Sequence, residues 1–368
     1  MFKVLNVIFY LIYMFFLFYC SSFYRTKNNK RFLNIFLGLM ILFFFFKELG
    51  LDYEAYKKWF YEIDILKKYK IFQNHIELIP YMIIYFLRKV GLPHQFFFGI
   101  MGMIPLLINF YLINNMKINK LQGLFFLFYI NFFTGFSDAI RQNVAASLIL
   151  LSYYYFSNCK KNRGIICIVS AFFFHYSTIF IIGIIFLLKI KWNKKKYIIA
   201  MFFIVISSFI LKNGIIYLNY LPEDNILFWK FKYYMLRYNN DRYNYLNEIH
   251  KFLYNTMNYL QILGIIILNI LLLKYRLFFN RFQIIILKSS IISSLISLLL
   301  FFIGAKTIGL RINLTFGFGM YLLSATSIVR KKDKNVIMAY YFLYNFIIML
   351  YYSGVHDPKS PFYLGDLI

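Results

Sequence analysis

The chain has 368 residues, of which 61% are hydrophobic, 23% aromatic and only 15% charged. A soluble globular domain carries about 25% charged residues, so this composition excludes one. The 41 Lys and Arg against 14 Asp and Glu give a net charge of +27; because the basic residues gather in short loops between apolar segments, they predict contact with membrane lipids and not with nucleic acid.

Apolar segments near the length of about 20 residues that crosses a bilayer recur along the chain. They predict an all-α polytopic integral membrane protein, with residues 1–368 forming a single transmembrane domain. A first crossing at 4–20 leads into the basic segment 21–31, which places that segment in the cytoplasm and the N-terminus outside. A crossing at 32–46 returns outward, and residues 47–77, which mix lysines with carboxylates, are expected to form an external loop with an interfacial helix.

Two apolar segments in the middle of the chain do not alternate simply. Residues 78–90 are short and contain a proline, so we expect an interfacial or half-depth helix. Residues 165–188 lie between two basic loops, 160–163 and 189–196, that both read as cytoplasmic. A kinked or re-entrant helical pair that breaks around His175 would enter and leave on one side. Irregular backbone at membrane depth is tolerated only where protein buries it or it lines a wet cavity, so both breaks point toward a site.

The C-terminal part alternates regularly. Crossings are expected at about 257–273, 284–303, 312–329 and 336–352, which leaves residues 219–256 as the larger external loop and the C-terminus outside. The total is about ten transmembrane helices plus two partial or re-entrant elements. Function is therefore expected inside the membrane or on its outer face.

Polar residues near the outer face are the candidate functional groups, because charge within the bilayer is costly and usually lines a cavity. Asp52 is followed by Tyr53 and Tyr56, which at (i, i+3) share one face of a helix. Such tyrosines can stack on sugar rings, while a carboxylate binds sugar hydroxyls. The alternative is an interfacial aromatic belt.

Two arginines, Arg141 and Arg311, each stand near the start of an apolar helix at the outer face. A guanidinium binds phosphate through two parallel hydrogen bonds, so two of them at one level could clamp a diphosphate. We expect Asp138 to cap the helix that carries Arg141, and the small residues 145–147 to permit close helix packing. The alternative is that both arginines extend to the lipid headgroups.

His175 lies in the middle of a 24-residue apolar stretch. A neutral imidazole there could accept a proton from a sugar hydroxyl or hold a substrate oxygen, although a purely structural role is open. In the external loop, Arg237 and Arg242 lie among tyrosines, a mixture that suits a glycan phosphate or a lipid headgroup equally. The sequence carries no HExxH, paired CxxC, P-loop or GxGxxG motif, so we expect no metal and no cofactor.

The order of these residues resembles the EpsG family of Wzy-type polysaccharide polymerases from bacterial capsule, exopolysaccharide and O-antigen clusters. The resemblance covers about residues 5–330 and departs from the family at Leu51, where Thr is usual. It rests on four motifs: Asp-Tyr-x-x-Tyr from Asp52, Glu77 opening a short helix, Ile-Arg-Gln-x-x-Ala from Ile140, and Phe-Phe-His-Tyr-Ser around His175.

The resemblance implies a GT-C-like, metal-independent glycosyltransferase of the bacterial inner (cytoplasmic) membrane. It would polymerise polyprenyl-diphosphate-linked repeat units, which serve as donor and acceptor, with a chain-length regulator as a further partner left open. Arg141 and Arg311 would bind the diphosphate, and His175 or Asp52 would act on the acceptor. The expected substrate-binding residues are Tyr53, Tyr56, Glu77, Gln142, Ser177, Arg237 and Arg242.

Two rival functions fit the same composition. A lipid-linked oligosaccharide flippase would also hold cationic residues in a central cavity, but it would more often show two similar halves, and none are visible here. An O-antigen-ligase-like glycan transferase shares the outer-face chemistry, but usually has a larger external domain than residues 219–256.

Overall fold

A computed structural model of the chain describes residues 30–46, 53–62, 76–116, 118, 120–131, 139–214, 248–304 and 306–353. Within these residues every regular element is a helix, as the composition predicts. The predicted first crossing at 4–20 and residues 219–247 of the larger predicted external loop lie outside the described residues.

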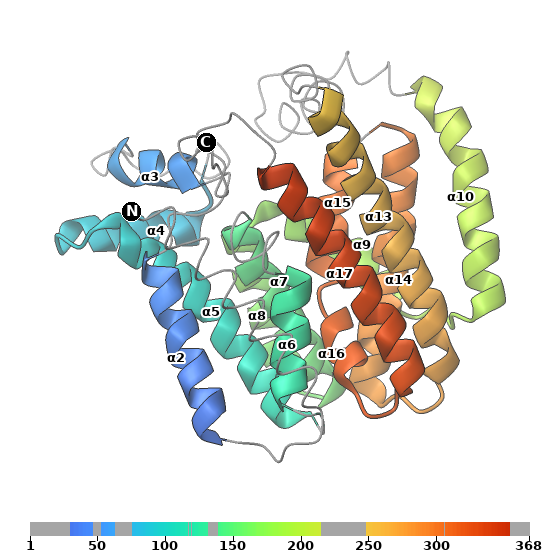
Figure 1. Cartoon of the computed structure of the whole chain (residues 1–368), viewed down its shortest axis with the longest axis horizontal. Coiled ribbons are helices and arrows are strands. Elements are labelled where there is room, and N and C mark those ends of the chain that lie inside the picture. Colours follow the sequence, from blue (N-terminus) through green and yellow to red (C-terminus); the bar gives the residue numbers. More distant parts are fainter. Residues whose placement is uncertain are drawn as a thin grey trace.

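The N-terminal helices form one half of the bundle (Figure 1). In Figure 1, α3 and α4 lie crosswise at the end of α2, and α4 packs against α5 and α8. Helix α5 packs against α2, α6 and α7, and α7 packs along α8. The bounds of this half are α2 (Lys30–Phe46), α3 (Tyr53–Glu62), α4 (Leu78–Lys89), α5 (His94–Asn115), α6 (Lys120–Asn131), α7 (Ile140–Ser157) and α8 (Lys161–Phe174).

The C-terminal helices surround α14, which packs against α7, α10, α13 and α15. Helix α10 stands at the edge of the bundle, and α17 packs against α13 (Figure 1). The bounds of this half are η2 (Tyr176–Phe180), α9 (Ile181–Leu187), α10 (Lys194–Gly214), α13 (Glu248–Leu272), η5 (Leu273–Tyr275), α14 (Arg281–Phe302), α15 (Lys306–Phe316), α16 (Met320–Ala325) and α17 (Lys331–Ser353).

Three helical segments among the described residues are long and apolar enough to cross a membrane: His94–Asn115, Asn258–Tyr275 and Arg281–Phe302. The predicted total of about ten crossings is not tested by these segments and stays a prediction. The predicted short element at 78–90 is the 12-residue helix α4.

The predicted break at His175 is confirmed. Helix α8 ends at Phe174, His175 has extended backbone with φ −159° and ψ 113°, and a 3-10 helix follows. The histidine therefore lies at a helix terminus, where backbone groups are available to side chains and ligands.

The segment 312–329, where a crossing is predicted, is divided between two helices. Helix α15 ends at Phe316 and α16 begins at Met320. Glycines between them lie against neighbouring atoms: a Cβ on Gly317 would be 2.7 Å from the carbonyl oxygen of Asn313, and one on Gly319 would be 2.7 Å from a methyl carbon of Leu150. At Gly317 the obstacle is a backbone atom that cannot move aside, so a larger residue there would strain the turn between the two helices.

Helix α14 fixes the position of its neighbours through a stripe of buried serines. It starts at a capping box in which the side chains of Asn280 and Gln283 each accept from the other residue's backbone N–H. Ser289 then bonds to Tyr153 of α7 at 2.8 Å, and Ser297 donates to the Gly309 carbonyl of α15 at 2.5 Å. Such contacts hold helices together where lipid offers no alternative partner, and here they join the two helices that carry Arg141 and Arg311.

Candidate active site

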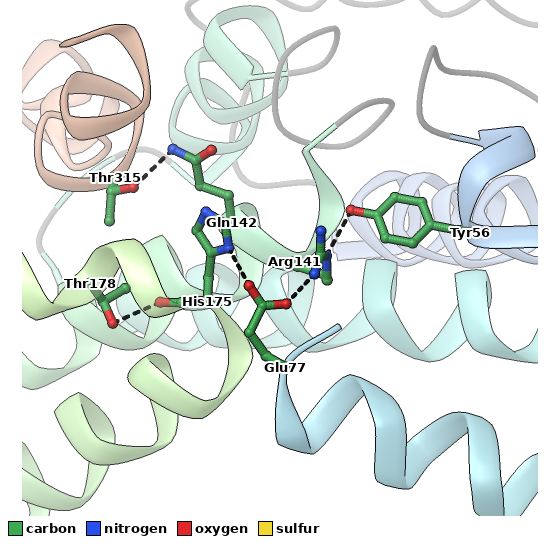
Figure 2. Close-up of polar contacts among 7 residues, drawn as sticks. All are labelled: Tyr56, Glu77, Arg141, Gln142, His175, Thr178 and Thr315. Carbon is green, nitrogen blue, oxygen red and sulfur yellow. Dashed lines mark hydrogen bonds and ion pairs between the residues drawn. The ribbon is translucent and has the colours of Figure 1, made fainter. Parts of the chain in front are cut away.

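Glu77, at the start of α4, joins two of the predicted functional residues (Figure 2). Its Oε2 accepts a short hydrogen bond from Nη1 of Arg141, and its Oε1 lies 3.1 Å from Nδ1 of His175. The carboxylate does not cap its own helix, and the residue is only 4% exposed. A buried charge is tolerated only when it is paired and hydrogen-bonded, and both oxygens of Glu77 meet this condition.

The carboxyl of Glu77 is ionised at neutral pH. Burial acts to raise its pKa, but the Arg141 guanidinium and the hydrogen bond from His175 outweigh burial and lower the pKa from 4.5 to about 2. The site therefore contains the fixed negative charge of Glu77 between two groups that can each carry a positive charge, the guanidinium of Arg141 and the imidazole of His175.

Arg141, the second residue of α7, is held from its other side by α3. Its Nε donates to the hydroxyl of Tyr56 at 3.1 Å, and its guanidinium lies 5.3 Å from the ring centre of Tyr56 and 4.9 Å from that of Trp59. Cation–π contacts of this kind are stronger when the cation is desolvated, and the Arg141 side chain is only 14% exposed. The guanidinium of Arg141 thus lies inside the protein. The alternative, in which this arginine extends to the lipid headgroups, does not describe its position.

The predicted shared face of Tyr53 and Tyr56 is confirmed, because both are buried on α3 together with Phe60. The hydroxyl of Tyr53 lies 2.9 Å from Nε2 of His94, and the hydroxyl of Tyr61 lies 2.9 Å from Nδ1 of the same ring. His94 is the first residue of α5, so these bonds attach α3 to the bundle and set the position from which Tyr56 holds Arg141.

Gln142 brings α7 and α15 together, as Figure 2 shows. Its amide nitrogen donates to the backbone carbonyl of Arg311 at 2.6 Å and to the hydroxyl of Thr315 at 2.9 Å. Helix α15 also packs against η2, which begins directly after His175. The structure therefore brings α7 and α15, the helices that carry the two predicted arginines, together next to His175.

Several buried polar atoms at this site have no hydrogen-bond partner among the described residues. They are Nε2 of His175, Oγ of Ser177 and Oδ1 of Asn143. An unsatisfied buried polar group costs about 1–3 kcal/mol, so these atoms indicate a place where a ligand or water binds.

The predicted close packing of residues 145–147 is confirmed. Ala145, Ala146 and Ser147 are buried on α7, and Ser147 accepts a hydrogen bond of 2.8 Å from the amide of Asn109 on α5. This packing fixes α7, and with it Arg141, against the body of the bundle.

Three predicted site residues, Asp52, Arg237 and Arg242, lie outside the described residues, and their roles stay predictions. Asp138 also lies outside them. The prediction that it caps α7 is wrong, because the N-cap is Ala139, which has no side chain that can accept a hydrogen bond.

Sequence reasoning missed Trp59, His94 and Thr315. Trp59 stands three residues after Tyr56 on the same helix, and His94 directly follows Pro93 at a helix start. These were available signals, but in a chain with 23% aromatic residues neither stood out. The described residues contain no cluster of three or more His, Cys, Asp or Glu side chains that could hold a metal ion.

Comparison with known proteins gives the family of the chain. No curated protein and no solved structure matched it. The model of the EpsG family matches residues 30–363, a range that contains Glu77, Arg141, His175 and Arg311. That family is associated with polysaccharide polymerases and exopolysaccharide biosynthesis. With its long apolar helices and this match over nearly the whole length, the chain belongs to the EpsG family and is an integral membrane protein of exopolysaccharide biosynthesis.

Proposed function

We propose that the protein polymerises polyprenyl-diphosphate-linked oligosaccharide repeat units into a cell-surface polysaccharide. The observation that carries this proposal is the convergence of Arg141 and His175 on the buried carboxylate of Glu77, with the backbone of Arg311 bonded to Gln142 beside them. A hydroxyl at the non-reducing end of one lipid-linked repeat attacks the anomeric carbon of another. The bond from that carbon to the diphosphate breaks, and the polyprenyl diphosphate leaves.

The arginines would stabilise the leaving group. Negative charge develops on the diphosphate as the bond breaks, and preorganised cations at that position lower the barrier. The stacking of Arg141 on Tyr56 and Trp59 supplies this preorganisation. Because two guanidinium groups bring the positive charge, we expect the reaction to be metal-independent.

The acceptor would lie on the side of the site where polar atoms are unsatisfied. His175 and Ser177 each have a buried polar atom without a partner among the described residues. Either could bind the acceptor hydroxyl or a neighbouring oxygen. Asp52, Arg237 and Arg242 are proposed to contact the glycan further out.

The setting that fits this reaction is the outer face of the bacterial inner membrane. The fold would be GT-C-like, with about ten crossings, two partial elements around α4 and His175, and both termini outside. Lipid-linked repeats are presented on that face, and the site lies next to α3 and α4, which belong to or follow the predicted external loop.

The experiment that tests the proposal compares surface and lipid-linked glycans of a deletion strain after complementation. Wild type should restore long chains. Arg141→Lys should lower them about 10- to 100-fold, because lysine loses the forked, stacked geometry and a charge-assisted hydrogen bond contributes about 1.5–3 kcal/mol. The matched control is Arg281→Lys, an exposed arginine at the start of α14, which should restore them.

The location of the accumulated product separates the rival functions. Single repeat units exposed on the outer face of the deletion strain support polymerisation. Repeat units held on the cytoplasmic side would indicate a flippase and contradict the proposal. Long lipid-linked chains that fail to reach their final acceptor would indicate a ligase-like transferase, and would contradict it as well.

A further inference from the structure

The contact between Glu77 and His175 determines which ring nitrogen carries the proton. Glu77 is paired with Arg141 and therefore ionised, and an ionised carboxylate has no proton to donate. In the 3.1 Å contact, Nδ1–H of His175 must then donate to Oε1 of Glu77. When the imidazole is neutral, its Nε2 consequently carries a free lone pair.

That lone pair is buried and unoccupied. Nε2 has no hydrogen-bond partner among the described residues, and the ring nitrogen that does not face Glu77 points away from it in Figure 2. The backbone of His175 is fixed on both sides: its N–H donates to the Ala171 carbonyl at 2.9 Å, and its carbonyl accepts from the Thr178 hydroxyl at 2.9 Å. The ring is therefore preset in position and in proton arrangement before any substrate arrives.

We propose that Glu77 is the positioning residue that holds His175 in the tautomer able to take the proton of the acceptor hydroxyl. This inference rests on the polymerase reaction proposed above. As the acceptor oxygen bonds to the anomeric carbon, its proton moves to Nε2 of His175. The electron pair of the broken bond leaves with the diphosphate, and Glu77 stabilises the resulting imidazolium through Nδ1–H.

The carboxylate of Glu77 links proton transfer at His175 to diphosphate binding at Arg141, since its other oxygen pairs with Arg141. A diphosphate arriving at Arg141 competes with Glu77 for the guanidinium. More of the carboxylate charge then acts on His175, which makes the imidazole a better base when the donor is bound. Loss of the carboxylate charge should therefore weaken proton transfer without weakening diphosphate binding.

The test uses the full-length protein in lipid vesicles, with turnover of lipid-linked repeat units and binding of polyprenyl diphosphate measured separately. Glu77→Gln should lower turnover about 100- to 10,000-fold, the range of general-base catalysis, because its amide can donate to Nδ1 and favour the wrong tautomer. Its affinity for polyprenyl diphosphate should stay within about threefold of wild type or increase. Glu62→Gln, at an exposed carboxylate on α3, is the matched control and should change neither quantity.

A double variant shows whether the two residues act in one step. Glu77→Gln combined with His175→Asn should be no slower than His175→Asn alone, because residues that act as a unit are not additive. A Glu77→Gln protein with wild-type turnover overturns the inference. So does equal loss of turnover and diphosphate affinity, since Glu77 would then serve Arg141 alone.

Two further outcomes keep the test decisive. If Glu77→Gln does not fold, His175→Asn replaces it; this variant should keep diphosphate affinity and lose turnover, and loss of both overturns the inference. If wild-type protein fails to elongate the repeat units, the proposed function itself is contradicted. Failure of the inference alone is recognised when the wild type is active and Glu77→Gln either is equally active or loses turnover and diphosphate affinity to the same extent.

Discussion

Glu77 illustrates what a charged residue requires in an otherwise apolar chain. It is buried between a guanidinium and an imidazole that lie 64 and 98 residues further along the chain. Removing one member of a buried ion pair leaves the other charge uncompensated, which lowers the stability of the protein by about 3–5 kcal/mol. Alanine and glutamine at position 77 both remove this charge, but glutamine keeps the shape of the side chain and one oxygen that can accept from Arg141, so it is the more informative substitution.

The depressed pKa of Glu77 predicts a pH dependence of stability. Burial opposes ionisation, but Arg141 holds the pKa at about 2, below its usual 4.5. A carboxyl with a lowered pKa contributes stability that is fully present above pH 4.5 and is lost as the pH falls toward 2. We expect the melting-temperature difference between wild type and Glu77→Gln in detergent to be constant from pH 5 to 8 and to shrink below pH 4. A difference that is the same at pH 7 and pH 2.5 would contradict this account.

Single residues were predictable where they break a pattern. His175 stands out as a polar residue in a long apolar stretch, and Arg141 as a charge near the start of an apolar helix. Their contact with Glu77 was not predictable, because nothing local in the sequence shows that segments so far apart converge. Trp59 and His94 were missed for the opposite reason: in an aromatic-rich chain their local surroundings look ordinary.

Among the helices, the packing of α14 on α15 controls where Arg311 lies. A Cβ on Gly309 would be 2.9 Å from the Ser297 carbonyl oxygen and 3.2 Å from its Cα. These are backbone atoms and cannot move aside as a side chain could. Arg311 follows two residues later on the same helix.

Gly309→Ala should therefore destabilise the protein by about 1–3 kcal/mol, the usual cost of overpacking. Gly38→Ala on α2 is the matched control: no atom lies within 4 Å of the added methyl, and alanine in a helix is favoured over glycine by about 0.5–1 kcal/mol. Thermal unfolding in detergent measures both. A Gly309→Ala protein as stable as Gly38→Ala would show that α14 and α15 are not packed this closely.

The residues at which helices begin and end were predictable from the sequence where a charge or a small-residue pattern marks them. Helix α7 begins at Ile140, one residue before Arg141, and α8 ends at the residue before His175. The division between α15 and α16 was missed, although Gly317 and Gly319 signal it. The apolar residues around them maintained the hydropathy of a single crossing, and hydropathy alone does not register a turn.

For the whole molecule, the basic loops predict which face lies in the cytoplasm. Two exposed positions lie in or next to loops that are predicted to be on opposite faces. Lys58 is exposed on α3, within the predicted external loop, and Cys159 is exposed between α7 and α8, next to a predicted cytoplasmic loop. The pair tests the orientation without disturbing the site.

A membrane-impermeant maleimide should label Cys159 only after the cells are permeabilised, in a protein whose other two cysteines, Cys20 and Cys167, are replaced by serine. Lys58→Cys in a cysteine-free background should react in intact cells. The physical reason is that positive loops remain on the cytoplasmic side during insertion. Labelling of Cys159 in intact cells, or of Lys58→Cys only after permeabilisation, would invert the topology and move the site to the wrong face.

The central claim is that this chain itself forms glycosidic bonds between lipid-linked repeats. The most direct measurement supplies purified protein in vesicles with one polyprenyl-diphosphate-linked repeat unit as the only substrate. The account predicts a ladder of products that differ by one repeat, release of one polyprenyl diphosphate for each bond formed, and loss of both in Arg141→Lys. Transbilayer movement of the repeat unit without any elongation would contradict it.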